Sequence, residues 1–201
     1  MILPSNFYAR DTLTVALELL GKKLVKREPS GLLLEGIIVE TEAYIGVEDK
    51  ACHARWRKKE TCFPMWGPGG FTYVYFTYGT YHMLNIVTEM DGFPSAVLIR
   101  ALEPINGMDL MFKNRKVEKA HDLTSGPGKL TMAFGISKEH NNIDLTKEDT
   151  LYIAEHSKPL KFDIVTTTRI GILYAEEYIN KPWRFYIKSN KFVSGSGLSQ
   201  K

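Results

Sequence analysis

The run Ile38-Val39-Glu40-Thr41-Glu42-Ala43-Tyr44 places two carboxylates inside an otherwise apolar β-strand pattern. Successive side chains of a strand point to opposite faces, so Glu40 and Glu42 are expected to share one face with Tyr44. A carboxylate beside an aromatic ring on such a strand is poorly solvated unless a partner or a cavity accommodates it, and catalytic acids and bases need such an environment. The alternative interpretation is a strand at a sheet edge whose glutamates lie in water.

A second run, from Phe71 to Thr88, predicts a β-hairpin rich in aromatic residues. Its two arms, residues 71–77 and 81–88, are largely β-branched or aromatic, and Gly79 between them allows a tight turn. The tip carries Tyr78, a large ring at a position where soluble proteins usually place polar residues. We therefore expect a protruding hairpin with Tyr78 at its tip.

The rest of the chain predicts strands and helices without a regular β-α alternation, which favours an α+β fold with a curved, largely antiparallel β-sheet and surrounding helices. Asp11 and Gly21 are the expected N-cap and stop signal of the first helix. Further strands are expected at residues 23–27, 32–44, 95–102, 151–154, 164–172 and 181–187, and helices at residues 11–20, at 106–119 and from Pro127. Residues 1–201 are expected to form a single compact domain, with a frayed tail over about 189–201.

The composition indicates a soluble globular protein with a mild positive charge. Of 201 residues, 44% are hydrophobic and 24% are charged, and the net charge is +3. Basic residues gather around Trp56, at residues 113–119 and at residues 181–191, and basic clusters with aromatic residues among them favour nucleic acid as a partner. Solvated helix faces and loop ends are the alternative for each cluster. No apolar stretch approaches the roughly 20 residues of a membrane span, so we expect a cytoplasmic protein without a membrane partner.

A metal site is not expected from the sequence. Cys52, His53 and Cys62 could supply three zinc ligands, but a fourth ligand at finger-like spacing is missing, and neither cysteine belongs to a C-x-x-C pair. Two cysteines also imply no disulfide framework.

The candidate site residues suit a flat substrate. Glu42 lies beside Tyr44, His53 follows in a loop, and Tyr75 lies on the hairpin. Asn85 lies on its return strand, and Arg100 is a guanidinium within the apolar run 95–102, where an arginine is usually paired or functional. Tyrosines around one carboxylate indicate a substrate with π faces. An exposed ring at a hairpin tip indicates a wedge that fills the gap left when a nucleotide is rotated out of a duplex.

Several runs, in the correct order, resemble the alkyladenine (3-methyladenine) DNA glycosylase family, in its bacterial type. The runs extend in register from about Leu13 to Ile187 and comprise residues 39–44, His53, and residues 73–79, 85–86, 98–104, 125–130, 169–171 and 181–186. The resemblance implies a monofunctional DNA glycosylase of base-excision repair. Such an enzyme flips alkylated or deaminated purines out of duplex DNA and hydrolyses the N-glycosidic bond, which leaves an abasic site without lyase activity.

The resemblance also implies roles for individual residues. Glu42 would activate the water that attacks C1′, and Arg100 and the backbone of Ile170 would help to hold that water. The pocket for the extruded base would consist of Tyr44, His53, Tyr75 and Asn85, and Tyr78 would enter the minor groove. The family uses no metal and no cofactor, and we expect a monomer that binds damaged duplex DNA, associates with the nucleoid and has no obligate protein partner.

Two departures and two alternatives accompany this resemblance. The segment Arg57–Trp66 does not reproduce the expected Thr-Pro-Arg-Asn type of run, and Thr80 replaces a larger side chain found in some relatives. The DNA contacts of this loop and the preference among lesions are therefore left open. A non-catalytic nucleic-acid-binding module, with Glu42 merely structural, is one alternative function, and a nucleoside hydrolase that holds a free nucleoside is the other.

Overall fold

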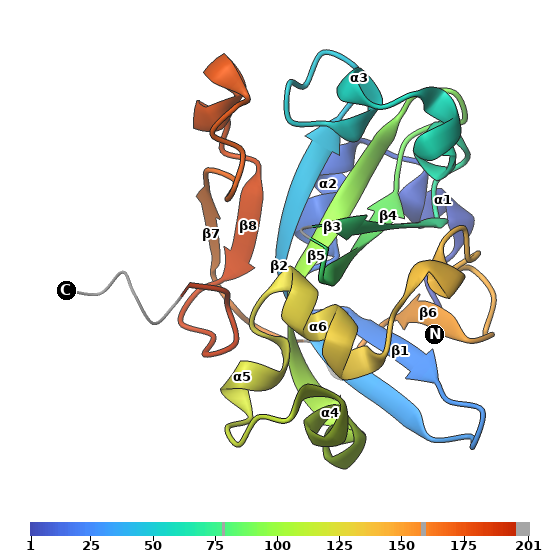
Figure 1. Cartoon of the computed structure of the whole chain (residues 1–201), viewed down its shortest axis with the longest axis vertical. Helices are drawn as coiled ribbons and strands as arrows, with labels where there is room; N and C mark the ends of the chain where they lie inside the picture. Colours follow the sequence, from blue (N-terminus) through green and yellow to red (C-terminus); the bar gives the residue numbers. More distant parts are fainter. Residues whose placement is uncertain (78, 158–159, 196–201) are drawn as a thin grey trace.

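The computed structural model describes residues 1–77, 79–157 and 160–195, so the predicted wedge residue Tyr78 lies outside the described residues. The chain forms an α+β fold in which helices surround one curled, antiparallel sheet that resembles half of a barrel (Figure 1). The strands are β1 (Lys23–Arg27), β2 (Leu33–Ile45), β3 (Thr72–Thr77), β4 (Tyr81–Val87), β5 (Ser95–Asn106), β6 (Leu151–Ala154), β7 (Ile164–Thr167) and β8 (Arg184–Ile187). This architecture confirms the fold class predicted from the sequence.

The helices are short and pack along the sheet. The α2 helix packs on β2 and β5, and α6 packs on β4 and β5. The α-helices are α1 (Ser5–Tyr8), α2 (Thr12–Glu18), α3 (His53–Trp56), α4 (Met108–Arg115), α5 (His121–Thr124) and α6 (Pro127–Phe134), and the 3₁₀ helices are η1 (Lys59–Thr61), η2 (Phe63–Trp66), η3 (Lys138–His140) and η4 (Glu176–Asn180).

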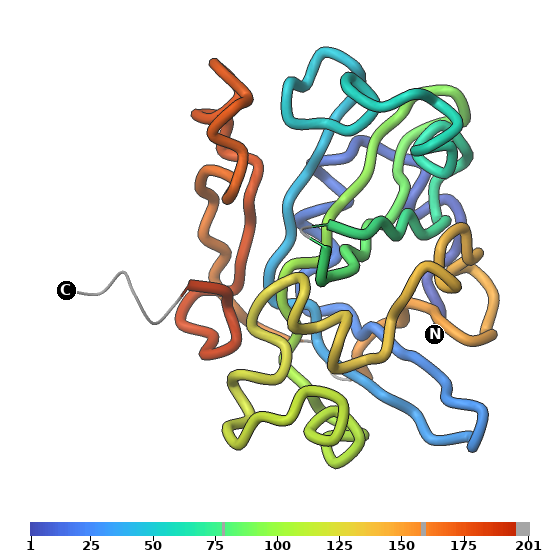
Figure 2. The backbone as a smooth tube through the Cα atoms, in the orientation of Figure 1, coloured from blue at the N-terminus to red at the C-terminus, as the bar shows by residue number. Residues whose placement is uncertain are grey.

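Strand β2 lies inside the sheet rather than at its edge. The order of the strands along the main path is β3-β4-β5-β2-β1-β6. Strand β1 pairs with residues 33–37 of β2, and β8 pairs with residues 40–42 of the same strand. Figure 2 shows the β7–β8 segment running alongside β2. Both Glu40 and Glu42 are fully buried on β2. The alternative of an edge strand with solvated glutamates is therefore wrong.

Two β-bulges interrupt the pairing of β2 with β5 at these glutamates. Ile38 pairs with Leu102 and Glu40 with Ala101, but Thr41 pairs with Ile99, so the register shifts on either side of Glu40. These shifts leave Val39 on β2 and Arg100 on β5 without a directly opposed residue. A bulge increases the local twist, but Glu40, Glu42 and Tyr44 still share one face as predicted, because Arg100 binds both glutamates and Tyr44 binds Glu42.

The aromatic hairpin protrudes as predicted. Strands β3 and β4 pair from Thr72 with Ile86 to Thr77 with Tyr81. Strand β5 pairs only with residues 85–87 of β4 among the residues described here, so the outer part of the hairpin extends past the sheet. The base of the hairpin is therefore fixed in the core, and its strand β4 packs against α6.

Most predicted element boundaries agree with the structure. Asp11 caps α2 by accepting a hydrogen bond from the Thr14 amide at 2.8 Å, and α6 begins with Pro127 in its first turn. Strand β5 is longer than expected and continues to Asn106. Helix α4 ends at Arg115, earlier than predicted, because the next residue adopts a left-handed conformation.

The predicted strand over residues 164–172 is wrong in its second half. Strand β7 ends at Thr167, and Arg169, Ile170 and Gly171 form a loop instead. Gly171 has a φ of +80°, a left-handed value that a continuing strand does not allow. The side chain of Arg169 turns into the protein, where a buried carboxylate binds it. A long-range ion pair therefore overrides the local strand propensity of this segment.

The last described residues pack against the sheet. Val193 is buried, and the Ser194 amide donates a hydrogen bond to Glu40 Oε2 at 2.7 Å. Residues 196–201 of the predicted frayed tail lie outside the described part of the chain.

Candidate active site

Glu42 accepts three hydrogen bonds from three separate segments of the chain. Its Oε2 accepts from the Tyr44 hydroxyl at 2.8 Å and from Arg100 Nη1 at 3.1 Å. Its Oε1 accepts from the backbone N–H of Ile170 at 2.7 Å. Strand β2, the bulge on β5 and the 169–171 loop therefore meet at one buried carboxylate.

The protonation of the neighbours makes Glu42 the acceptor in these contacts. Burial raises the pKa of Tyr44 well above its ordinary value, and the charge of Glu42 raises it further, so the phenol keeps its proton. Burial alone would lower the pKa of Arg100, but Glu42 and Glu40 outweigh this effect and the pKa is raised. Hydrogen bonds consequently run from Tyr44 and Arg100 toward the Glu42 carboxylate.

A pocket of about 270 Å³ lies in front of this carboxylate. All three donors to Glu42 line the pocket, whereas Glu42 itself lies behind them. The predicted site residues that line the pocket are Tyr44, His53, Tyr75, Asn85, Arg100 and Ile170. Apart from Glu42 behind them, these are all the predicted site residues that the structure describes, and they come from six parts of the chain: β2, α3, β3, β4, β5 and the loop after β7.

The side of the pocket formed by α3 and the hairpin is an aromatic cluster. His53 Nδ1 lies 2.9 Å from the Tyr73 hydroxyl, and the ring centroids of His53 and Tyr75 are 4.3 Å apart at an interplanar angle of 62°. The guanidinium of Arg57 lies 5.4 Å from the centroid of the Tyr75 ring. Tyr73, which is not among the predicted site residues, orients His53 through its hydroxyl. Residues two apart on a strand point to the same face, so the spacing of Tyr73 from the predicted pocket residue Tyr75 could have indicated this role.

His53 is held in its neutral form. Burial lowers its pKa to about 4, and the positive charge of Arg57 contributes to this shift. A neutral imidazole has one donor and one acceptor nitrogen, so His53 can bind the Tyr73 hydroxyl with one and a ligand in the pocket with the other.

This shift predicts a pH dependence of stability. The free energy of unfolding should decrease as the pH falls from about 6.5 toward about 4, because the unfolded histidine binds a proton that the folded one does not. Below the folded pKa both states are protonated and the effect levels off. Urea unfolding of the wild type and of His53→Gln should give free energies of unfolding whose difference changes with pH only within this window. A constant difference from pH 4 to pH 7 would contradict it.

Asn85 is fixed by the backbone of its own hairpin. Its Nδ2 donates to the Tyr73 carbonyl at 3.0 Å and, at a longer 3.4 Å, to the Met83 carbonyl. The side chain is buried at the inner end of the hairpin and lines the pocket. These contacts fix the orientation of its amide.

Glu40 is a second buried carboxylate on the same arginine. It accepts from Arg100 Nε at 3.0 Å, from Arg184 Nη1 at 2.8 Å and from the Ser194 hydroxyl at 2.9 Å. The structure therefore excludes the alternative in which Glu40 lies in water. Arg100 is thus clamped between Glu40 and Glu42, and its guanidinium has little freedom to turn.

The loop Arg57–Trp66, in which the sequence departs from the family pattern, packs beside the aromatic cluster. It contains η1 and η2, and it buries Cys62 and Met65 against Tyr73. Trp56, just before this loop, is 60% exposed and lines a shallow groove with His53 and Arg57.

Comparison with known proteins identifies the class of enzyme. The chain matches the family model described as Methylpurine-DNA glycosylase (MPG) over residues 6–191 and belongs to this family. It is therefore an enzyme of the DNA glycosylase type, which acts on DNA.

Curated relatives are similar over nearly their whole length. Proteins named "Putative 3-methyladenine DNA glycosylase" from Alkaliphilus oremlandii and from Clostridium botulinum (strain Alaska E43 / Type E3) are 50% and 51% identical, and each match covers 96% of this chain and 99% of the relative. One of the same name from Methanocella arvoryzae is 48% identical over 96% of both chains.

Among the helices of the described residues, none is long and apolar enough to cross a membrane.

Proposed function

We propose that this enzyme removes alkylated or deaminated purines from duplex DNA by hydrolysing the N-glycosidic bond, with Glu42 as the general base. One observation carries the proposal. A fully buried carboxylate lies directly behind a pocket large enough for a base, and its three hydrogen-bond donors form the wall between them. A general base needs such proximity to the reacting atoms.

In the proposed reaction, Glu42 takes a proton from a water molecule whose oxygen attacks C1′ of the deoxyribose. The bond between C1′ and the purine nitrogen breaks, and its electron pair leaves with the base. Arg100 and the backbone of Ile170 orient the water. The products are a free purine and an abasic site, and no lysine forms a Schiff base with the sugar.

The aromatic pocket explains a preference for damaged purines. Alkylation places positive charge on a purine, which makes it a better leaving group and strengthens its attraction to the faces of Tyr44 and Tyr75. Tyr44 stacks on one face of the base, and His53 and Tyr75 lie on the other. His53 also hydrogen-bonds the base, and its neutral form avoids repulsion of a cationic base. Asn85 lies under the purine edge and disfavours the 2-amino group of guanine.

The proposal includes a wedge at the hairpin tip, Tyr78, which lies outside the described residues. Tyr78→Ala should slow base release from duplex lesions and weaken duplex binding, because the gap left by the extruded nucleotide would remain unfilled. Release from single-stranded substrates should change much less. Single-turnover rates and binding constants on both substrates measure this difference, and full activity and affinity on the duplex would argue against the wedge.

The direct test uses labelled duplexes that carry hypoxanthine, ethenoadenine or a methylated purine, followed by alkaline cleavage of abasic sites. We expect strand breaks with at least one of these lesions and none without alkali. The reaction should proceed in EDTA, since the proposal requires neither metal nor cofactor, and size-exclusion chromatography should give a monomer.

Three results would oppose the proposal. The absence of abasic product from every lesion would leave only a binding module. Cleavage of free nucleosides as fast as of duplex DNA would indicate a nucleoside hydrolase. Exclusion of the protein from the nucleoid in cells would contradict the expected action on cytoplasmic DNA.

A further inference from the structure

We propose that the buried Asp49–Arg169 ion pair is a positioning device that aligns the Glu42 group with the aromatic side of the pocket. The inference rests on the proposed function and adds two residues that do not touch the reacting atoms. Asp49 follows β2, and Arg169 belongs to the loop after β7.

The ion pair has the geometry of a rigid connection. Arg169 Nη1 lies 2.6 Å from Asp49 Oδ2, and Nη2 lies 2.8 Å from Oδ1, so the contact is bidentate. Both side chains are fully buried. A bidentate arginine–carboxylate contact fixes orientation as well as distance, and the burial excludes water that could replace either partner.

Asp49 fixes the segment that carries His53. Its Oδ2 accepts from the Ile45 amide at 3.1 Å, and its Oδ1 accepts from the Ala51 amide at 3.0 Å. One carboxylate thus determines the path of the chain from the end of β2 to the start of α3, where His53 begins the aromatic side of the pocket.

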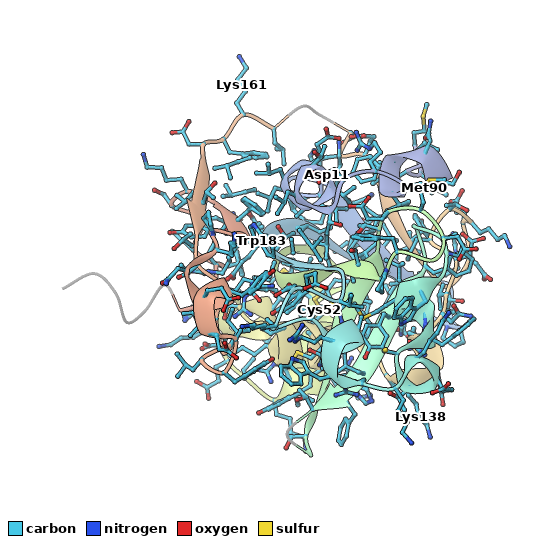
Figure 3. All side chains as sticks on the ribbon, turned by 90° about the horizontal axis from the view of Figure 1, so that it is seen from above. Asp11, Cys52, Met90, Lys138, Lys161 and Trp183 are labelled. Atoms are coloured by element: carbon cyan, nitrogen blue, oxygen red, sulfur yellow. The ribbon has the colours of Figure 1, made fainter. Side chains whose placement is uncertain are left out.

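Arg169 fixes the opposite side. It donates to the Ala43 carbonyl at 2.9 Å, and its guanidinium lies 4.8 Å from the ring centroid of Tyr44 and 5.0 Å from that of Trp183. The next residue is Ile170, whose amide binds Glu42. Arg169 therefore controls both the Tyr44 ring and the Ile170 amide. Figure 3 labels Trp183, one of the two rings beside Arg169, and Cys52, which lies three residues after Asp49 in the chain.

Stability alone does not require this ion pair. Replacing a buried ion pair by well-packed apolar groups of similar volume is often neutral or stabilising, because the desolvation of both charges is avoided. The same two segments already pack through Ala51, Ile172 and Ala175, and the half-buried Lys50 joins them by ion pairs with the exposed Glu176 and Glu177. The distinctive property of Asp49–Arg169 is its fixed geometry next to Glu42.

The test is single-turnover base release by Arg169→Lys, with the rate expressed per folded molecule. The variant retains the positive charge but loses the bidentate contact and the planar stacking. We expect a rate about 100-fold below the wild type, the loss that a misplacement of about 1 Å can cause. Affinity for a lesion-containing duplex should remain within about threefold, since binding groups distant from the pocket are unchanged.

Two further variants separate positioning from folding. Asp49→Asn/Arg169→Gln removes both charges, should remain folded, and should be as slow as Arg169→Lys. Lys50→Gln, the matched control, removes an exposed connection between the same segments and should have the wild-type rate. In a Glu42→Gln background, Arg169→Lys should cost less than about tenfold, because residues that act as a unit are not additive.

The outcomes distinguish this inference from the proposed function. A wild-type enzyme that releases no base from any lesion defeats the proposed function. A wild-type enzyme that is active while folded Arg169→Lys matches its rate overturns only the positioning role. Equal losses of rate with and without Glu42 would also overturn it, because Arg169 would then act independently of the carboxylate.

Discussion

Replacement of Glu42 by glutamine is expected to slow base release by about 10²–10⁴-fold, the usual contribution of a general base. The amide retains the size of the carboxylate but cannot take a proton from water. Affinity for a lesion-containing duplex should be nearly unchanged, because Glu42 lies behind the pocket wall rather than in it. Single-turnover kinetics and equilibrium binding on the same duplex measure both quantities, and unchanged turnover would remove Glu42 from the mechanism.

The matched control is Glu40→Gln. Glu40 is equally buried, lies on the same strand and binds the same Arg100. In both variants one carboxylate oxygen becomes an amide NH₂ that faces hydrogen-bond donors, so both should be less stable than the wild type. If Glu42 acts as the base, only Glu42→Gln should lose most of its rate per folded molecule. Equal losses would assign the effect to the position of Arg100 instead.

The largest effect on stability is expected from Arg100→Met. This variant leaves Glu40 and Glu42 buried without the cation that they share, 3.0 Å and 3.1 Å from its nitrogens. Arg184 still pairs with Glu40 at 2.8 Å, so the uncompensated buried charge is that of Glu42, and leaving one partner of a buried ion pair in this state typically costs about 3–5 kcal/mol. Urea unfolding at pH 7 should show this decrease in the free energy of unfolding.

The decrease should become smaller at acidic pH. Without Arg100, burial favours the protonated carboxyl groups, so lowering the pH relieves the uncompensated charge in the variant. Arg27→Met is the control, since Arg27 and Glu148 form an ion pair at 3.6 Å with side chains 43% and 63% exposed. Its loss should be below about 1 kcal/mol. Equal losses in Arg100→Met and Arg27→Met would contradict the buried cluster.

The sequence predicted those parts of the fold that depend on local patterns. Strand β2 and the aromatic hairpin follow from β-branched and aromatic runs. Asp11 marks the start of α2 because its side chain accepts a hydrogen bond from Thr14, only three residues further along the chain. The candidate pocket residues were found because the family motifs contain them. The structure brings together Tyr44, His53 and Asn85 around one cavity, whereas their catalytic roles stay predictions.

Sequence patterns could not predict the contacts between distant segments. Asp49 and Arg169 are separated by 120 positions, and neither residue type at its own position indicates the other. The bulge beside Arg100 consists of two register shifts, which a period of two residues cannot reveal. Arg169 lies in a β-rich run, so its local sequence favours a strand. Only the structure shows that its partner is Asp49.

The contact between Ser194 and Glu40 has a consequence for the synthesis of the protein. These residues are 154 positions apart, so a nascent chain lacks the Ser194 donors to Glu40 until nearly all of the described residues have left the ribosome. Since domains emerge from the N-terminus first, Arg100 and Glu40 are complete only when residue 194 arrives. An incomplete chain would therefore have the motifs of a glycosylase without a fixed site. Force measurements on arrested chains should register a late folding step near this length.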